Sequence, residues 1–260
     1  MKIAVCVKAV PDTEAKIAIA GDKTNIDFAG ISFIISPYDE FAVEEAVKLK
    51  EKLGGETTVI SMGGAECTDV LRNCLARGID NAVHLSDADF AGLDTLSTAK
   101  VLAAAIKDGG YDLIFVGQQG VGGDNSQVPS MLAELLGCAQ ATMVLKFETD
   151  GTTFRAEREI EGAHEVVQGN LPALISAQKG LNEPRYPGIK SVMAARRKEI
   201  ATKDAAALGV KGKVGGSEIK VKIKEMALPP QRPQGRKIEG DSDSQVKELV
   251  NLLRSEAHVL

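Results

Sequence analysis

Tryptophan is absent from the 260-residue sequence, and aromatic residues make up only 4% of it. This scarcity disfavours nucleic-acid surfaces built from stacked aromatic side chains. The 31 basic and 36 acidic residues give a formal net charge of −5, so the chain has no overall basic footprint. We therefore expect no nucleic-acid partner. No apolar run approaches the length of a membrane span, so we expect no membrane insertion either.

Cysteine and histidine are also few. The four cysteines (6, 67, 74 and 138) form no CxxC pair, and only three histidines are present. Zinc sites usually combine such residues at close spacing, so we expect no metal site. Each cysteine lies among apolar residues, which predicts buried, reduced thiols and a reducing compartment, most simply the cytoplasm. The N-terminus runs directly into a strand-like segment without the layout of a signal peptide.

Apolar patterns alternate between strands and helices over the first half of the chain. Buried-strand patterns occur at Lys2–Lys8, Thr58–Met62, Asn81–Leu85 and Leu113–Val116. Helical stripes lie between and after them, near residues 42–53, 67–75, 96–106 and 128–136. Strands that are apolar on both faces and alternate with helices predict an α/β fold with a mostly parallel, doubly wound sheet.

The pattern changes after Gly137. Two strand-like runs, Thr142–Glu148 and Thr153–Ile160, flank a turn signal and predict a β-hairpin, and Ala173–Gln178 is a further strand candidate. From about residue 185 the periodicity is lost, and only Asp243–Leu253 looks helical. We expect a core over residues 1–184 and, over residues 185–260, an extended arm that needs a partner surface.

A glycine-rich stretch, Gly117–Gln127, follows one strand and opens a helix. Glycines let the backbone approach a phosphate, and a helix N-terminus attracts negative charge. Asp124 followed by Gln127 is a variant of the capping box, and Ser36 before Pro37 predicts a second helix start. From this pattern alone, a nucleotide site and a set of tight structural turns are both open.

A second glycine turn, Ser61–Glu66, follows an internal strand. It is faintly similar to the pyrophosphate loop of ATP-pyrophosphatase enzymes, so an adenylating or nucleotide-binding enzyme is one alternative. Neither glycine stretch is a Walker A loop. The charged, strand-like stretch Arg158–Gly162 predicts a solvated edge strand. His164 beside Glu161 and Glu165 suggests acid–base chemistry, but no nucleophile or metal cluster accompanies it, so we expect no catalytic residue there.

Several stretches together resemble the β subunit of electron transfer flavoproteins. They are Val5–Lys8, Pro37–Ala46, Gly117–Gln127, Ala156–Gly162, Pro172–Ser176 and Leu181–Tyr186. They occur in the family's order over roughly residues 1–200. One signature position differs, because Ala163 stands where glycine or an acid is usual.

This resemblance implies a sheet like that of adenine-nucleotide α-hydrolases, with a nucleotide-binding core and a C-terminal arm that wraps an α subunit. It implies an electron carrier rather than a stand-alone catalyst. The heterodimer would accept electrons from flavin dehydrogenases, often the acyl-CoA dehydrogenases of fatty acid β-oxidation. It would pass them through FAD to a quinone reductase (a quinone oxidoreductase) or another acceptor. The FAD would be shared with the α subunit, and an AMP would be buried in this one.

The resemblance also implies site residues. The AMP pocket corresponds to Cys6, Ser36, Pro37, Tyr38, Asp39, Met62, Gly117, Gln119, Val121, Gly122, Gly123, Asp124, Asn125, Ser126, Gln127 and Val128. Glu159 corresponds to a glutamate near the shared flavin, and Leu181 to the anchor of the loop that docks on dehydrogenases. Thr13 departs from a tyrosine that approaches the flavin in the family.

A subgroup of this family bifurcates electrons, with NADH as donor and a second FAD in place of AMP. The runs Val10–Thr13 and Gly123–Val128 are somewhat similar to that subgroup. The residues that distinguish the two types lie largely in the α subunit. We favour AMP and keep the second FAD as the alternative.

Overall fold

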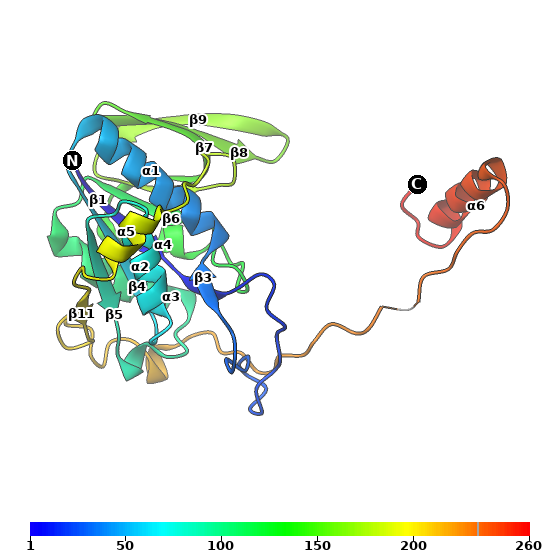
Figure 1. Ribbon diagram of the computed structural model, residues 1–260, viewed down its shortest axis with the longest axis horizontal. Helices are drawn as coiled ribbons and strands as arrows, with labels where there is room; N and C mark the ends of the chain where they lie inside the picture. The colour runs from blue at the N-terminus through cyan, green and yellow to red at the C-terminus, as the bar shows by residue number, and fades with distance from the viewer. Residues whose placement is uncertain (233) are drawn as a thin grey trace.

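A computed structural model describes residues 1–232 and 234–260 (Figure 1). Within these residues, nine strands form one sheet in the order β11-β5-β4-β1-β6-β10-β7-β8-β9. Their bounds are β1 (Lys2–Val7), β4 (Glu56–Met62), β5 (Asn81–Leu85), β6 (Leu113–Gly117), β7 (Ala139–Thr149), β8 (Thr153–Ile160), β9 (Ala163–Asn170), β10 (Ala173–Ala177) and β11 (Ala201–Lys203). Two short strands, β2 (Ala9–Pro11) and β3 (Phe33–Ile35), pair separately.

Helices cover both faces of this sheet. They are α1 (Pro37–Leu53), α2 (Cys67–Ala76), α3 (Thr95–Ile106), α4 (Val128–Leu136) and α5 (Ile189–Ala195), with α6 (Ser242–Ser255) at the end of the chain. Strands β11 to β7 pair in parallel, and β8 and β9 extend the sheet as antiparallel strands. The predicted α/β class with a mostly parallel, doubly wound sheet is confirmed.

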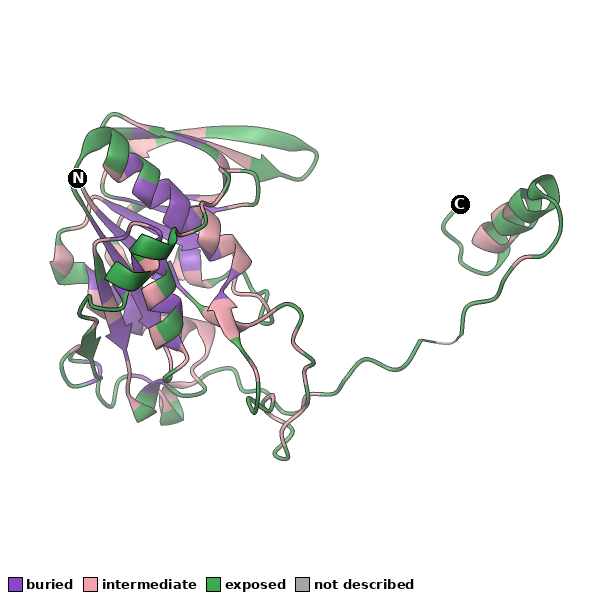
Figure 2. Ribbon diagram, viewed as in Figure 1, coloured by how far each residue is buried: buried purple, intermediate pink, exposed green. Residues whose placement is uncertain are grey.

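Burial on both faces explains why the parallel strands have continuous apolar sequences. In β1, Ile3, Val5 and Val7 belong to one core cluster with residues of α1 and α2, whereas Ala4 and Cys6 belong to a second cluster with residues of α3 and α4. Figure 2 shows the buried residues concentrated in the central strands and the helix faces that cover them. A strand covered on both sides has no polar face, so it lacks period-two alternation.

The predicted hairpin is confirmed as β7 and β8, but the sequence did not indicate the third antiparallel strand, β9. Most β9 residues are exposed, and the strand pairs with β8 along its whole length. Because backbone pairing rather than an apolar face holds β9, its sequence has no hydrophobic period to detect. The Nδ1 atom of His164 on β9 lies 2.9 Å from Glu157 Oε1 on β8, so the hydrogen-bond partner of this ring is Glu157.

The expectation that the core ends near residue 185 is wrong, because structure packed against the core continues as far as Val214. Helix α5 packs on α2, β11 adds a parallel strand beside β5, and Ala205, Val210 and Val214 are buried in the core. Short elements with few apolar residues gave no periodic signal. After Glu218 the chain is extended. The N–H groups of Lys220 and Met226 still donate to Asp94 Oδ2 and to the Lys23 carbonyl oxygen, and beyond Met226 the chain leads away from the body toward α6 (Figure 1).

The predicted helix near the C-terminus is confirmed as α6, whose first turn is capped by the Asp241 side chain accepting from the Ser244 N–H at 2.9 Å. No residue of α6 is buried (Figure 2). Cys6, Cys67 and Cys74 are buried free thiols, but Cys138 is only partly buried, which corrects the expectation for that residue. Among the described residues, no helix is both long and apolar enough to cross a membrane.

Candidate functional site

The order in which the chain adds strands to the sheet reverses at β1. From β1 the chain proceeds to β4 and β5 on one side, then returns to β6 on the other side of β1. In open parallel sheets, the crevice at such a reversal, outside the carboxyl ends of the strands, is where ligands bind. Cys6, Met62 and Gly117 lie at the carboxyl ends of β1, β4 and β6, so the structure brings these three predicted site residues to one edge.

The Asp39 carboxylate joins the two strand ends that border this crevice. Oδ2 accepts the Lys8 N–H at 2.7 Å, and Oδ1 accepts the Gly117 N–H at 2.9 Å. Helix α1 begins here, with Pro37 in its first turn and the Ser36 carbonyl accepting the N–H groups of Asp39 and Glu40. The predicted helix start is therefore confirmed, although the Ser36 hydroxyl does not cap it.

Position 117 requires glycine for a steric reason. A Cβ there would clash with the Asp39 carboxylate and with the backbone of Tyr38. The Ser36 hydroxyl, which leaves α1 uncapped, instead donates to the Gln119 carbonyl oxygen at 3.5 Å. Ser36, Tyr38, Asp39, Gly117 and Gln119 therefore form one contiguous border of the crevice.

Burial determines the protonation of the two titratable groups at this edge. Desolvation raises the pKa of the Asp39 carboxyl to about 7, although its two backbone N–H donors favour the charged form. Desolvation first, and the Asp39 charge second, raise the pKa of the Cys6 thiol to about 12. Cys6 therefore remains a protonated thiol at neutral pH and is not a nucleophile.

The glycine-rich loop after β6 has an unusual backbone. Gly122, Asp124 and Ser126 have φ angles of 92°, 49° and 52°, and residues 122–127 are exposed. The Gln119 side chain holds the loop, because its Nε2 donates to Asp124 Oδ1 at 3.0 Å and its Oε1 accepts from the Ser126 hydroxyl at 2.8 Å. Alternation in the sign of φ is typical of backbone nests that bind anions.

The predicted capping role of Asp124 is wrong. Helix α4 begins at Val128 with Gln127 as its N-cap residue, and no side chain caps it. The Asp124 carboxylate binds Gln119 instead, and the left-handed backbone at Asp124 and Ser126 keeps these residues outside the helix. The Gln127 side chain accepts from the Thr95 hydroxyl at 2.8 Å. The N-cap of α4 is therefore Gln127, three residues after the expected cap at Asp124.

The exposed loop fits a phosphate-bearing ligand. Among the described residues, the N–H groups of Gly122, Asn125 and Ser126 have no acceptor. A cation lies across the same loop, since Lys8 Nζ donates to the Val121 carbonyl oxygen at 3.4 Å. Gln118 Oε1 is buried without a donor. Free N–H groups, a positive charge and an unpartnered acceptor together suit the phosphates and base or sugar of a nucleotide.

Lys8 was not among the residues expected in this site. Its signal in the sequence is a lysine directly after a run of five apolar residues, Ile3–Val7, which the structure buries. Such a residue marks the point where the strand emerges at the crevice.

The second glycine turn does not offer comparable groups. The Gly64 N–H donates to Glu66 Oε1 at 2.8 Å, and the Gly63 N–H donates to the Leu85 carbonyl oxygen at 3.1 Å. A carboxylate of the chain itself therefore lies where a pyrophosphate loop would receive an anion. This arrangement argues against the adenylating alternative.

Two further predicted residues lie outside the crevice. Glu159, on β8, is exposed and accepts from Gln178 Nε2 at 3.2 Å, which connects it to the end of β10 next to Gly117. Leu181, on the loop after β10, is half-buried and packs against the core. Among the hydrogen bonds of the described residues, none joins either residue to the glycine-rich loop.

The fold and this edge define an α/β protein with a glycine-rich loop at the point where the strand order reverses, which is where open α/β sheets bind ligands. Residues 24–208 match the electron transfer flavoprotein domain family. The chain is 41% identical to the electron transfer flavoprotein subunit beta of Bacillus subtilis (strain 168), with all of both chains covered. It is 39% identical to that of Thermoanaerobacterium thermosaccharolyticum over all of both chains, and 36% identical to that of Mus musculus over 94% of each.

The chain therefore belongs to the electron transfer flavoprotein family, as the resemblance implied. This membership supports a role in flavin-dependent electron transfer.

The raised pKa of Asp39 gives a pH-dependent prediction. Between about pH 4 and pH 7 the folded chain retains a proton that the unfolded chain has released, so this group's contribution to stability falls as the pH rises. Relative to the Asp39→Asn variant, we expect the free energy of unfolding of the wild type to fall by up to about 1.4 kcal/mol per pH unit as the pH rises across this window. Urea unfolding at pH 4 to 8 measures the difference.

The control is Asp94→Asn. Asp94 caps α3, and its pKa is lowered to about 2, so it titrates below this window. Its effect on the free energy of unfolding should stay constant from pH 5 to 8. If the wild type and Asp39→Asn had parallel pH profiles, Asp39 would not be the titrating group.

Proposed function

We propose that this chain is the β subunit of a heterodimeric electron transfer flavoprotein. It would pair with an α subunit, accept electrons from an acyl-CoA or related flavin dehydrogenase, and deliver them to a quinone oxidoreductase or another acceptor. Full-length similarity to β subunits supports the pairing. The four free cysteines fit a reducing compartment such as the cytoplasm.

The glycine-rich crevice is the observation that best supports a nucleotide in this subunit. We propose that residues 119–128 bind the phosphates of AMP through backbone N–H groups, with Lys8 as the nearby cation and the edge residues 36–39 beside the rest of the nucleotide. FAD, when bound and shared with the α subunit, supplies the redox chemistry. Exposed Glu159 would face the shared flavin, and the β subunit itself would have no catalytic residue.

The alternative is a bifurcating flavoprotein with a second FAD in the same crevice and NADH as donor. The exposed loop favours neither ligand through its amides alone, since both contain phosphate. The pocket observations therefore support a nucleotide, and AMP remains our choice between the two.

Gly123→Val tests the crevice. Position 123 has a negative φ, and a Cβ there would meet no atom closer than 3.8 Å, so valine should fold without strain and fill the space in front of the amides. We expect the heterodimer to lose its AMP, or second FAD, and to become less stable. Chromatography of nucleotides released by heating gives the content per heterodimer.

Gly21→Val is the matched control, because a Cβ at this exposed position meets nothing within 4 Å. It should leave the nucleotide content unchanged. Full nucleotide content in Gly123→Val would rule out this loop as the binding site.

The extended arm provides a second test. Residues after Met226 make no contact with the core among the hydrogen bonds of the described chain, and α6 has exposed Val246 and Leu249 on one side. We propose that the arm wraps the α subunit. Deleting residues 229–260 should abolish stable heterodimer in co-purification while the β core still melts cooperatively. Undiminished co-purification of the truncated chain would contradict this role.

The dehydrogenase should dock on the segment from Leu181 to Met193. Leu181 is half-buried, whereas Ile189 and Tyr186 are 82% and 93% exposed. Exposure therefore makes Ile189 the better placed side chain to enter a partner's pocket, and the anchor role of Leu181 remains a prediction to be tested beside it. The five basic residues of segment 185–198 could steer an acidic partner.

We expect the substitution of the true anchor by alanine to weaken docking roughly ten- to a hundredfold, since burial of one aliphatic side chain contributes about 1.5–3 kcal/mol. The measurement compares reduction of Ile189→Ala and Leu181→Ala heterodimers by the dehydrogenase with their reduction by dithionite. The anchor variant should slow only in the first reaction. Slowing in both reactions would indicate a structural residue instead, and no change in either variant would place docking elsewhere.

A further inference from the structure

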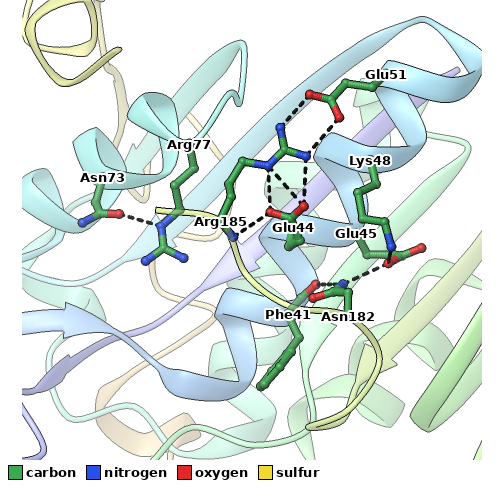
Figure 3. Close-up of polar contacts among 9 residues, drawn as sticks. All are labelled: Phe41, Glu44, Glu45, Lys48, Glu51, Asn73, Arg77, Asn182 and Arg185. Atoms are coloured by element: carbon green, nitrogen blue, oxygen red, sulfur yellow. Dashed lines mark hydrogen bonds and ion pairs between the residues drawn. The ribbon is translucent and has the colours of Figure 1, made fainter. Parts of the chain in front are cut away.

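The loop between β10 and α5, residues 178–188, contains no helix or strand, yet it is attached to helix α1 at two points (Figure 3). Asn182 Nδ2 donates to the Phe41 carbonyl oxygen at 3.0 Å and to Glu45 Oε2 at 2.9 Å. Three residues later, Arg185 binds two other glutamates of α1. The loop thus follows the helix over more than two turns.

Arg185 uses both sides of its guanidinium group. Nε donates to Glu44 Oε2 and Nη2 to Glu44 Oε1, each at 2.9 Å, while Nη1 and Nη2 donate to the two Glu51 oxygens at 2.6 and 2.9 Å. The Arg185 backbone N–H also donates to Glu44 Oε2, at 3.0 Å. Two bidentate contacts at once require a planar guanidinium, and a lysine ammonium cannot reproduce them.

The two glutamates differ in burial. The Glu44 side chain is 7% exposed, and among the described residues Arg185 provides all of its polar partners. The Glu51 side chain is 54% exposed. A buried carboxylate needs a paired charge, so moving Arg185 away from Glu44 would cost free energy by leaving that carboxylate unpaired. Glu51 helps to orient the guanidinium plane, but as an exposed partner it contributes little to stability.

The far end of the following segment is held as well. Arg72 of α2 donates from Nη1 to the carbonyl oxygens of Ala195, Arg196 and Lys198, at 2.8, 3.1 and 3.3 Å. The chain from 186 to 194 is therefore fixed at both ends, while Tyr186, Ile189 and Met193 within it are 93%, 82% and 59% exposed. These three large side chains are therefore exposed to solvent on a backbone segment whose ends are fixed.

We propose that Arg185 is a positioning residue for the docking of the electron donor. By binding Glu44 and Glu51 of α1, it fixes the chain directly before residues 186–193 and so keeps this segment in a preformed shape, so that the dehydrogenase meets an ordered apolar surface. An ordered segment avoids the loss of conformational freedom that a loose loop would suffer on binding. This inference rests on the docking function proposed above, and it adds the device that presents the surface.

The principal test is the double variant Glu44→Gln with Arg185→Gln in the assembled heterodimer. Removing both charges together leaves no unpaired buried carboxylate, so the fold should survive. The donor is an acyl-CoA dehydrogenase that reduces the wild-type heterodimer, supplied with its acyl-CoA. With the heterodimer as the varied substrate, we expect KM to rise by roughly tenfold because the loop must order on binding, with kcat and dithionite reduction unchanged.

Hydrogen exchange provides the readout independent of the donor. Amides of residues 181–195 should exchange faster in the double variant, while FAD and nucleotide contents stay at wild-type levels. Glu51→Gln is the milder variant, since it removes one bidentate contact at an exposed position, and we expect a KM rise of about two- to threefold. Lys146→Gln breaks an exposed ion pair with Glu157 elsewhere and should change neither KM nor exchange.

Three results would overturn the proposal, and they are distinguishable. Unchanged exchange in the double variant would mean that Arg185 does not hold the loop. Faster exchange with an unchanged KM, while Ile189→Ala raises KM, would mean that docking occurs here but needs no positioning. Faster exchange with KM unchanged in both variants would mean that the proposed docking surface itself is wrong.

Discussion

Three segments that are distant in sequence meet at the carboxylate of Asp39. It accepts the N–H of Lys8 after β1 and the N–H of Gly117 after β6, and it belongs to the first turn of α1. These bonds fix the separation of the two strand ends on either side of the reversal in strand order, which is where open α/β sheets bind ligands. They also exclude any side chain at residue 117. The glycine-rich loop leaves the sheet from this fixed point, so its geometry depends on a single buried acid.

Helix α1 connects the two regions for which we propose functions. Its N-terminus contacts the start of the glycine-rich loop through Ser36 and Asp39, and its later turns hold the β10–α5 loop through Glu44, Glu45 and Glu51. Both ends of the helix are anchored by charged or polar bonds rather than by apolar contact alone. One rigid element therefore sets the place of the ligand edge and of the exposed surface after residue 185, although the two lie on separate loops.

Elements with two buried faces were predictable from sequence, whereas elements held mainly by backbone pairing were not. Strand β1 and helix α1 follow directly from apolar runs and a proline start, but β9 and β11 are exposed and lack a hydrophobic period. At the site, the glycine stretch was recognisable from its strand–loop–helix order. The binding of Asp124 to Gln119 was not, because it depends on a left-handed backbone. The pairing of Arg185 with Glu44 spans 141 residues and has no local pattern.

We propose above all that this chain binds a structural AMP beside Asp39, while the flavin is shared with an α subunit. The most direct measurement is the cofactor inventory of the co-purified heterodimer, obtained by denaturation and quantitative chromatography. The account predicts one FAD and one AMP per heterodimer. Two FAD and no AMP, or one FAD with no second nucleotide, would contradict it.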